Sequence, residues 1–231
     1  MKILAVETST EYCSVALWQD GVLSERCELV GQKHSEVLMA MLDALLQDSG
    51  CRIQDIDGIA FGKGPGSFTG VRIACGVTQG LALGANLNVV GVCTLEAVAE
   101  ASGKDQVIAA LDARMGELYL AAYQRRNGAW HTVIAPCLCK AEDAPLLEGD
   151  GWCGAGNGFA VQRAALQARY DAHLQVGCVE GGVFPRAAAI AVLGAAAFAK
   201  GLAVDAALAL PQYLRDKVAL KTSEREALKA Q

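Results

Sequence analysis

Glu7 and Asp112 are the first candidates for chemistry, because each is an acidic residue that directly follows an apolar segment. Carboxylates at the ends of strands can position Mg²⁺, and through it the phosphates of a nucleotide, since this ion takes oxygen ligands. The alternative is that both side chains cap or hydrogen-bond a neighbouring turn. A phosphate cradle also needs glycine, whose backbone N–H groups are open to approach. Asp112 is followed by Ala-Arg-Met before Gly116, so a nucleotide site there would be weak and vestigial.

The segment Gly62-Lys-Gly-Pro-Gly-Ser-Phe-Thr-Gly70 is the richest glycine motif of the chain. It is not a Walker P-loop, and Ser67 does not sit in the Gly-x-Ser-x-Gly frame of a nucleophile elbow. The motif predicts a turn that leads into a helix, with Ser67 or Thr69 as the cap and free N–H groups that could attract an anion. A purely structural turn and a contact with a ligand or partner are both consistent with it.

A peptidase would need a nucleophile beside a base, and the pair that the chain offers is Ser67 with His34. These residues fall in different predicted elements, and no sequence frame places the imidazole near the hydroxyl. Peptidase activity is therefore only a minor alternative.

The histidines and cysteines do not have the spacing of a metal site. The three histidines lie far apart in the sequence, and the nine cysteines are scattered without any Cys-x-x-Cys. In a cytosolic chain of this length, such cysteines are expected as small buried hydrophobic residues. Cys137-Leu-Cys139, the one close pair, is expected in a strand or loop. We expect this chain to hold no metal and no cofactor of its own.

Composition narrows the class of protein. The 231 residues are 53% hydrophobic and 19% charged, which is typical of a globular chain. The apolar run from Ala187 to Ala199 is too short to span a bilayer, and the carboxylate at Glu7 interrupts any secretion signal. We therefore expect a cytoplasmic protein without membrane contact. A net charge of −5 argues against binding of nucleic acid over a broad surface, so another subunit must make most of the contacts with any RNA.

The elements that must position these residues follow from periodicity and turn signals. A hairpin signal at Asp20-Gly21 predicts three antiparallel strands at the start of the chain. Apolar spacing predicts a first helix over His34–Gln47, and the glycine motif leads into a second helix over about Thr69–Ala85. A third helix begins with Thr94 as its N-cap. The order is βββαβαβα, with strands at Ile3–Val6, Cys13–Trp18, about Val22–Leu29, Ile59–Phe61 and Val89–Val92.

After a polar stretch at 101–105 the opening pattern repeats, with an apolar strand, an acidic residue and a hairpin signal at Asn127-Gly128. We interpret the repeat as a duplication. It predicts an N-terminal lobe over residues 1–104 that faces a C-terminal lobe and tail over residues 105–231. Two later helices are predicted at Val161–Tyr170 and Pro185–Lys200.

Three glycines of the second helix, Gly76, Gly80 and Gly84, recur at four-residue steps and form a ridge. Each glycine inside a helix costs about 1 kcal/mol against alanine, so the ridge needs a compensating gain. Close approach of another helix or a sheet would supply it. The neighbour is either the chain's own sheet or first helix, or the helices of a partner subunit.

The end of the chain carries four cations at four-residue spacing, on one side of a possible helix. The default interpretation is a solvated face, and the alternative is contact with RNA or an acidic partner. These residues are Lys217, Lys221, Arg225 and Lys229.

A strand that ends in an acidic residue and is followed by a hairpin, once in each of two facing lobes, resembles the acetate and sugar kinase, heat-shock chaperone and actin superfamily. The resemblance implies an α/β fold of two RNase H-like lobes, each a mixed sheet flanked by helices. In that superfamily the hairpins hold the phosphates of ATP and the acidic groups position Mg²⁺, roles that would fall to Glu7 and Asp112. One functional hypothesis is therefore a nucleotide-dependent phosphotransferase or ATPase.

A set of short motifs is similar to the TsaB (YeaZ) family, densely over about residues 1–125 and again at 211–215. The motifs are Glu7-Thr-Ser-Thr10, His34-Ser-Glu-Val-Leu38, Gly64-Pro-Gly-Ser-Phe-Thr-Gly-Val-Arg-Ile-Ala74, Leu111-Asp-Ala-Arg114 with Glu117-Leu-Tyr119, and Pro211-Gln-Tyr-Leu-Arg215. The resemblance implies the bacterial machinery that places threonylcarbamoyl on the adenosine beside the anticodon of tRNAs that read codons beginning with A.

The resemblance also implies a division of labour. The related subunit TsaD is the transferase, TsaB is its non-catalytic partner, and the ATPase TsaE joins them. TsaD carries a His-x-x-x-His metal pair, whereas the matching stretch Gly91–Val98 here contains no histidine. We therefore expect a scaffold that pairs with a TsaD-like subunit through the two helices of the first lobe, contacts tRNA only through the complex, and could form a homodimer. The expected partner contacts are Val37, Leu38, Met41, Leu45, Ile73, Gly76, Val77, Gly80, Leu81 and Gly84.

Overall fold

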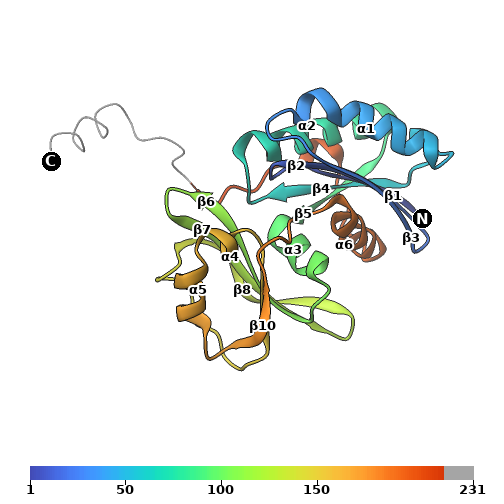
Figure 1. Ribbon diagram of the computed structural model, residues 1–231. Coiled ribbons are helices and arrows are strands. Elements are labelled where there is room, and N and C mark those ends of the chain that lie inside the picture. The colour runs from blue at the N-terminus through green and yellow to red at the C-terminus, as the bar shows by residue number, and fades with distance from the viewer. Residues whose placement is uncertain (216–231) are drawn as a thin grey trace, which may run out of the picture.

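The computed structural model describes residues 1–215 as two lobes, each built on one five-stranded sheet (Figure 1). The four cations predicted on one face of a terminal helix lie outside the described residues. Within the described part, no helix combines the length and the apolar character needed to cross a bilayer. Two mixed sheets flanked by helices confirm the predicted fold class.

The first sheet confirms the predicted order of strands and helices. Its strand order is β3-β2-β1-β4-β5, antiparallel across the two hairpin-linked pairs and parallel from β1 through β4 to β5. The strands are β1 (Lys2–Glu7), β2 (Tyr12–Gln19), β3 (Val22–Leu29), β4 (Gly58–Gly64) and β5 (Asn88–Cys93). The central strands are buried on both faces of the sheet, so their side chains are apolar on both sides and the sequence shows no alternation of apolar and polar residues.

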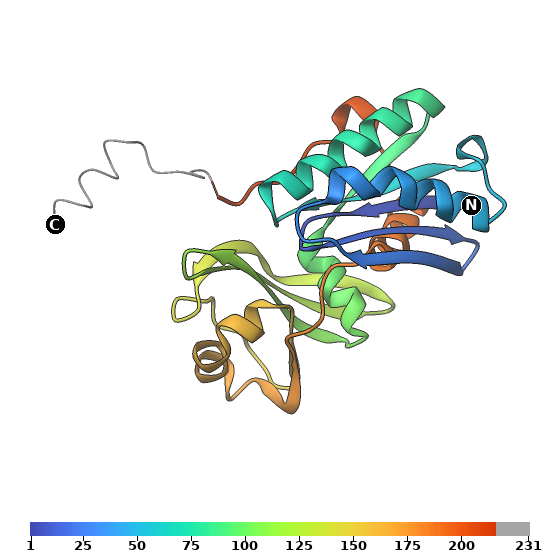
Figure 2. The same ribbon diagram turned by 45° about the horizontal axis from the view of Figure 1, so that its top comes forward.

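Two pairs of helices cover the two faces of this sheet. The helices α1 (His34–Asp48) and α2 (Phe68–Ala85) pack side by side on one face (Figure 2), and α3 (Thr94–Ser102) and α6 (Ala187–Ala199) pack on the other. The chain between α1 and β4 includes the short 3-10 helix η1 (Ile53–Asp55).

The second sheet repeats the topology of the first, with strand order β10-β9-β6-β7-β8. Its strands are β6 (Gln106–Arg114), β7 (Glu117–Arg126), β8 (Ala129–Lys140), β9 (Trp152–Ala155) and β10 (Leu174–Glu180). The predicted helix over Val161–Tyr170 corresponds to α5 (Arg163–Tyr170), and the short helix α4 (Gly158–Val161) precedes it on the same face of the sheet. The other face packs on α3, which therefore lies between the two sheets.

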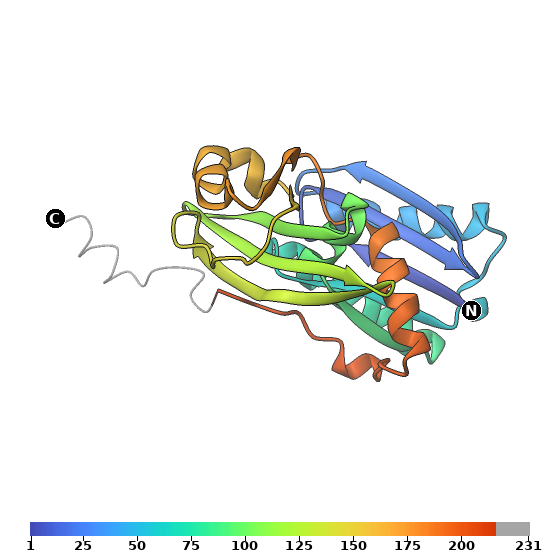
Figure 3. The ribbon, with the colours of Figure 1, turned by 90° about the horizontal axis from the view of Figure 1, so that it is seen from below.

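The alanine-rich helix α6 packs on the first lobe (Figure 3), whereas the sequence predicts that all of residues 105–231 belong to the second. It contacts β1, β2 and β4, and a Cβ added at Gly194 would lie only 2.4 Å from the Cβ of Ala60. The following segment, which includes the 3-10 helix η2 (Ala206–Leu208), pairs Val204 with Val89 and buries Ala209 in the first core. The first lobe is therefore completed by the C-terminal part of the chain.

The helix caps agree with the prediction at one position and differ at another. Ser67 is the N-cap of α2, and its Oγ accepts a hydrogen bond from the Gly70 N–H at 3.3 Å. Thr94 is not the N-cap of α3. Cys93 occupies that position, and the Thr94 hydroxyl instead donates to the carbonyl of Pro65. Thr94 thus ties the start of α3 to the glycine motif.

Gly70 lies where the first turn of α2 crosses the backbone of Thr8. A Cβ at this position would lie 2.0 Å from the Thr8 carbonyl oxygen, and the Thr8 hydroxyl donates to the Gly70 carbonyl at 2.7 Å. We expect Gly70→Ala to lower the free energy of unfolding by about 2–4 kcal/mol, measured by denaturant unfolding, because backbone atoms cannot give way as a side chain can.

Gly76→Ala is the matched control for this substitution, since it changes a glycine of the same helix that has open space around it. It should raise the free energy of unfolding by up to about 1 kcal/mol through helix propensity. Equal effects of the two substitutions would contradict the close crossing at Gly70.

Candidate functional site

Glu7 is enclosed at the end of β1, with 1% of its surface exposed. Its Oε1 accepts a hydrogen bond from the Ser9 N–H, whereas Oε2 is buried without a hydrogen-bond partner among the described residues. A Cβ at Gly62 would lie 1.7 Å from Oε2, so glycine is what makes room for this carboxyl. Burial raises the pKa of Glu7 from 4.5 to about 7. This environment favours a protonated carboxyl over an ion that faces Mg²⁺.

Asp112 closes a turn between β6 and β7. Its Oδ1 accepts a hydrogen bond from the Arg114 N–H at 2.8 Å, and its Oδ2 forms an ion pair with the Arg114 guanidinium at 3.2 Å. Arg114 and Met115 both have positive φ, as Gly116 does. Side chains therefore occupy the turn in which a phosphate cradle would need glycine.

A cavity of about 560 Å³ lies between the two lobes. Asp112 lines it, but Glu7 is not among its lining residues, so the two predicted acidic residues do not share the cavity. The Ser67 cap of α2 and the Arg114 turn line it from opposite lobes. A cleft between two lobes is a common place for a ligand, but the second-lobe turn that lines this one carries the side chains of Arg114 and Met115.

The Pro211–Arg215 segment lines this cavity and contacts both lobes. Tyr213 packs against Phe68 with ring centroids 5.3 Å apart, and its hydroxyl accepts a hydrogen bond from Arg72 Nε at 2.7 Å. Arg215 pairs with Glu117 at 2.7 Å on the second lobe. From the sequence, only the family resemblance indicates that this motif is functional. The contacts of Tyr213 with the first lobe and of Arg215 with the second depend on the tertiary structure, so no local sequence pattern predicts them.

Helix α2 turns its glycine ridge to solvent. Gly76, Gly80 and Gly84 are exposed, and a Cβ at any of them would have no atom of another described element within 4 Å. The alternative that the ridge packs against the chain's own sheet or first helix is therefore wrong. Leu83, three residues from Gly80 and thus a helix-surface neighbour, is 64% exposed.

The predicted apolar contacts are distributed differently from the glycines. Leu38, Met41 and Leu45 of α1 are buried in the chain's own core, at 1%, 5% and 2% exposure. They cannot reach a partner, because the apolar stripe of α1 packs on β2 and its neighbours. Four of the predicted contacts are half-buried and keep part of their surface open; these are Val37 on α1 and Ile73, Val77 and Leu81 on α2.

The geometry gives no support to a serine nucleophile. The Ser67 hydroxyl caps α2 by accepting from Gly70, and His34 Nε2 is bonded to the carbonyl of Tyr12 at 3.1 Å. Each side chain thus forms its hydrogen bond with a backbone group, and the two side chains do not form a hydrogen bond with each other. A base that activated Ser67 would have to contact its Oγ.

Comparison with known proteins places the chain in a family. A family model described as TsaD, tRNA N6-adenosine threonylcarbamoyltransferase, matches residues 21–222. The tRNA threonylcarbamoyladenosine biosynthesis protein TsaB of Escherichia coli is 42% identical over 96% of this chain and 97% of its own length. The protein of the same name from Bacillus subtilis is 36% identical over 64% of this chain and 69% of its own.

A solved structure agrees with the sequence comparisons. YeaZ from Pseudomonas aeruginosa is 35% identical, and it superposes with a TM-score of 0.82 over 92% of this chain and 99% of its own. Sequence relatives and fold thus agree over nearly the whole chain. The chain belongs to the TsaB (YeaZ) family of tRNA threonylcarbamoyladenosine biosynthesis proteins.

Proposed function

We propose that this chain is a non-catalytic subunit of the complex that transfers threonylcarbamoyl to the adenosine next to the tRNA anticodon. Its role is to stabilise and position a TsaD-like transferase. The observation that carries the proposal is the solvent-facing ridge of Gly76, Gly80 and Gly84 on α2. Three exposed glycines inside a helix are costly unless another backbone approaches them closely.

The docking surface combines this ridge with the open parts of its apolar neighbours. A helix of the transferase that lies along α2 would cover the ridge and the exposed Leu83, and would bury the remaining surface of Val37 and Val77. Burial of apolar area is worth about 25 cal/mol per Å², and it is partly offset by the entropy of association. Leu38, Met41 and Leu45 contribute indirectly, by holding α1 and α2 on the same face of the sheet.

The two acidic residues and the helix after β5 support a non-catalytic role. Glu7 is enclosed away from the cavity, Asp112 is paired with Arg114, and α3 carries no histidine. The cavity between the lobes is consequently a vestigial nucleotide site with weak affinity. This geometry does not support the alternative function, a nucleotide-dependent phosphotransferase or ATPase.

The remaining partners follow from the same role. The complex is cytoplasmic and includes a TsaE-like ATPase, and tRNA contacts this chain indirectly, since a net charge of −5 gives little attraction for the phosphate backbone. When no transferase is present, the exposed ridge can pair with a second copy of the chain.

The experiment is a reconstitution with the homologue that co-purifies from the chain's own cell extract. We expect mass spectrometry to identify a transferase-like protein with a His-x-x-x-His motif, and tRNA modification to require both proteins together. The chain alone should show no turnover and only weak binding of Mg-ATP in calorimetry. Turnover by the purified chain at an ordinary enzymatic rate, about 1–10³ s⁻¹, would overturn the proposal.

A further inference from the structure

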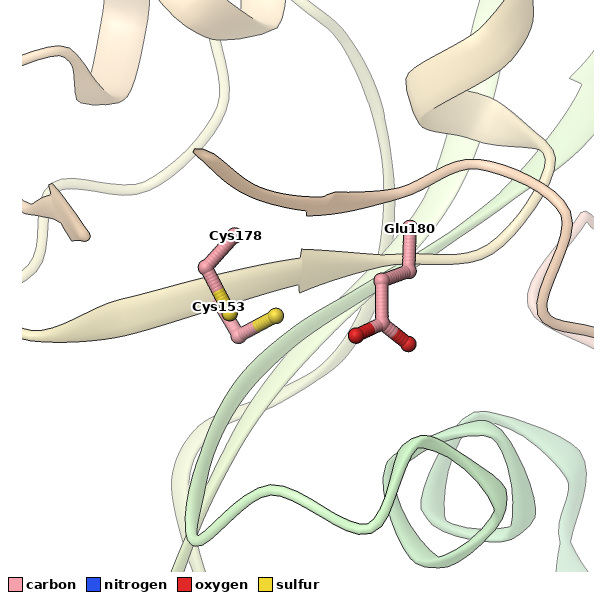
Figure 4. A group of neighbouring side chains, drawn as sticks. All are labelled: Cys153, Cys178 and Glu180. Atoms are coloured by element: carbon pink, nitrogen blue, oxygen red, sulfur yellow. The ribbon is translucent and has the colours of Figure 1, made fainter. Parts of the chain in front are cut away.

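The edge of the second sheet brings together two cysteines and a glutamate that the proposed function does not use. Cys153 lies on β9, and Cys178 and Glu180 lie on β10. The two sulfur atoms and a carboxylate oxygen all lie within 4.8 Å of one another. Figure 4 shows the three side chains on the same side of the strands, with the sulfur atoms adjacent and the carboxylate beside them.

Strand pairing is what assembles this group. β9 and β10 are parallel neighbours in which Val179 pairs with Gly154, so Cys178 and Cys153 each come one residue before a paired position. Residues two apart on a strand share a face, so Glu180 projects on the side of Cys178. Sequence spacing could not reveal the group, because α4 and α5 separate the two strands along the chain.

The donor set matches a particular class of ion. Thiolates are soft ligands that select zinc or copper(I) over magnesium and calcium, and a carboxylate oxygen is a common additional zinc ligand. Three protein ligands leave one position of a tetrahedral zinc ion for water or an external ligand. The sulfur atoms are shielded, with Cys153 2% and Cys178 9% exposed. The Glu180 side chain is 37% exposed and provides the path by which an ion enters.

One neighbouring cation opposes metal binding. Lys104 Nζ lies 3.5 Å from Glu180 Oε1, and its side chain is 44% exposed. Because that side chain has solvent around it, the ammonium can move away when a metal takes its place. Lys104 follows α3 and precedes β6, so the site lies at the junction of the two lobes.

We propose that Cys153, Cys178 and Glu180 form a Zn²⁺ site that displaces Lys104 from Glu180 and releases the two thiol protons to solvent. The ion joins β9 to β10 and frees the ammonium at the lobe junction. The proposal is independent of the partner-binding role, because its three ligands lie on β9 and β10 of the second sheet, whereas the glycine ridge lies on α2 of the first lobe.

The test adds Zn²⁺ to the chemically reduced full chain and measures affinity by competition with a chromophoric chelator. We expect one ion per chain. Removal of an outer-shell residue costs roughly 10–100-fold in affinity, so Cys178→Ser should lose more than about 100-fold. Glu180→Gln should also weaken binding, while Lys104→Gln should strengthen it, because it removes the competing charge.

The matched control is the double variant Cys137→Ser with Cys139→Ser, which removes the other close pair of thiols on β8. It should bind Zn²⁺ as the unmodified chain does. Co²⁺ added to the unmodified chain gives a second readout that needs no substitution, since thiolate ligation produces an intense charge-transfer absorption. No binding, equal affinity in Cys178→Ser, or a loss in the control alone would each overturn the proposal.

Discussion

Gly80→Leu is expected to weaken association with the TsaD-like transferase by roughly 5- to 150-fold and to leave the isolated chain folded. Gly80 lies at the centre of the exposed ridge on α2, and a Cβ placed there has no atom of the described neighbouring elements within 4 Å. In the complex the leucine would hold two helix backbones apart. Overpacking of this kind costs about 1–3 kcal/mol, which sets the expected range.

Stability of the isolated chain should change in the opposite direction. Leucine has a higher helix propensity than glycine, by somewhat less than about 1 kcal/mol, so the free energy of unfolding should rise. The effect on association therefore cannot be attributed to unfolding. Calorimetry of the chain with the purified transferase measures the affinity, and thermal unfolding of the chain alone measures its stability.

The matched control is Ala168→Leu, which places the same side chain on the exposed face of α5 in the second lobe. It should leave the affinity for the transferase unchanged. An unchanged affinity in Gly80→Leu would mean that α2 is not the interface, and reconstituted tRNA modification would then have to depend on another surface.

Glu7→Gln is expected to raise the free energy of unfolding at pH 8 by up to about 3 kcal/mol and to change it little at pH 4. Desolvation raises the pKa of Glu7 to about 7 in the folded chain, against 4.5 when the residue is exposed. The folded state thus holds the proton more tightly than the unfolded state. Stability from the protonated carboxyl is fully present below about pH 4.5 and is lost as the pH rises to about 7.

The measurement is the difference in unfolding free energy between the original chain and Glu7→Gln across pH 4 to 8, by denaturant titration. Because other groups also titrate, the difference isolates the contribution of Glu7. The exposed Glu142 offers a control, since Glu142→Gln should add no comparable slope. A pH-independent difference would contradict an enclosed carboxyl. So would stabilisation by Mg-ATP that the glutamine variant abolishes, because it would assign Glu7 to a metal.

The strands and helices within residues 1–104 could be predicted almost completely from the sequence. Hairpin signals such as Asp20-Gly21 and the apolar spacing of α1 and α2 are local patterns, and local patterns determine where a strand turns and where a helix begins. The ridge of Gly76, Gly80 and Gly84 was visible for the same reason. The prediction that Leu38 of α1 contacts a partner was wrong, because this side chain is buried in the chain's own core. An apolar stripe indicates that one face of a helix is buried, but it does not indicate whether the chain itself or a partner buries it.

The tertiary structure decided what depends on contacts between distant parts of the chain. In the tertiary structure α6 packs on the first lobe, and the Glu7 carboxyl is buried beside Gly62. The pairing of β9 with β10 places Cys153 next to Cys178. The sequence by itself determined the family, the order of the elements over residues 1–104 and the four-residue spacing of the glycines on α2. Burial, pKa and the meeting of distant side chains were decided only by the fold, because sheet pairing brings together residues whose separation along the chain carries no periodic signal.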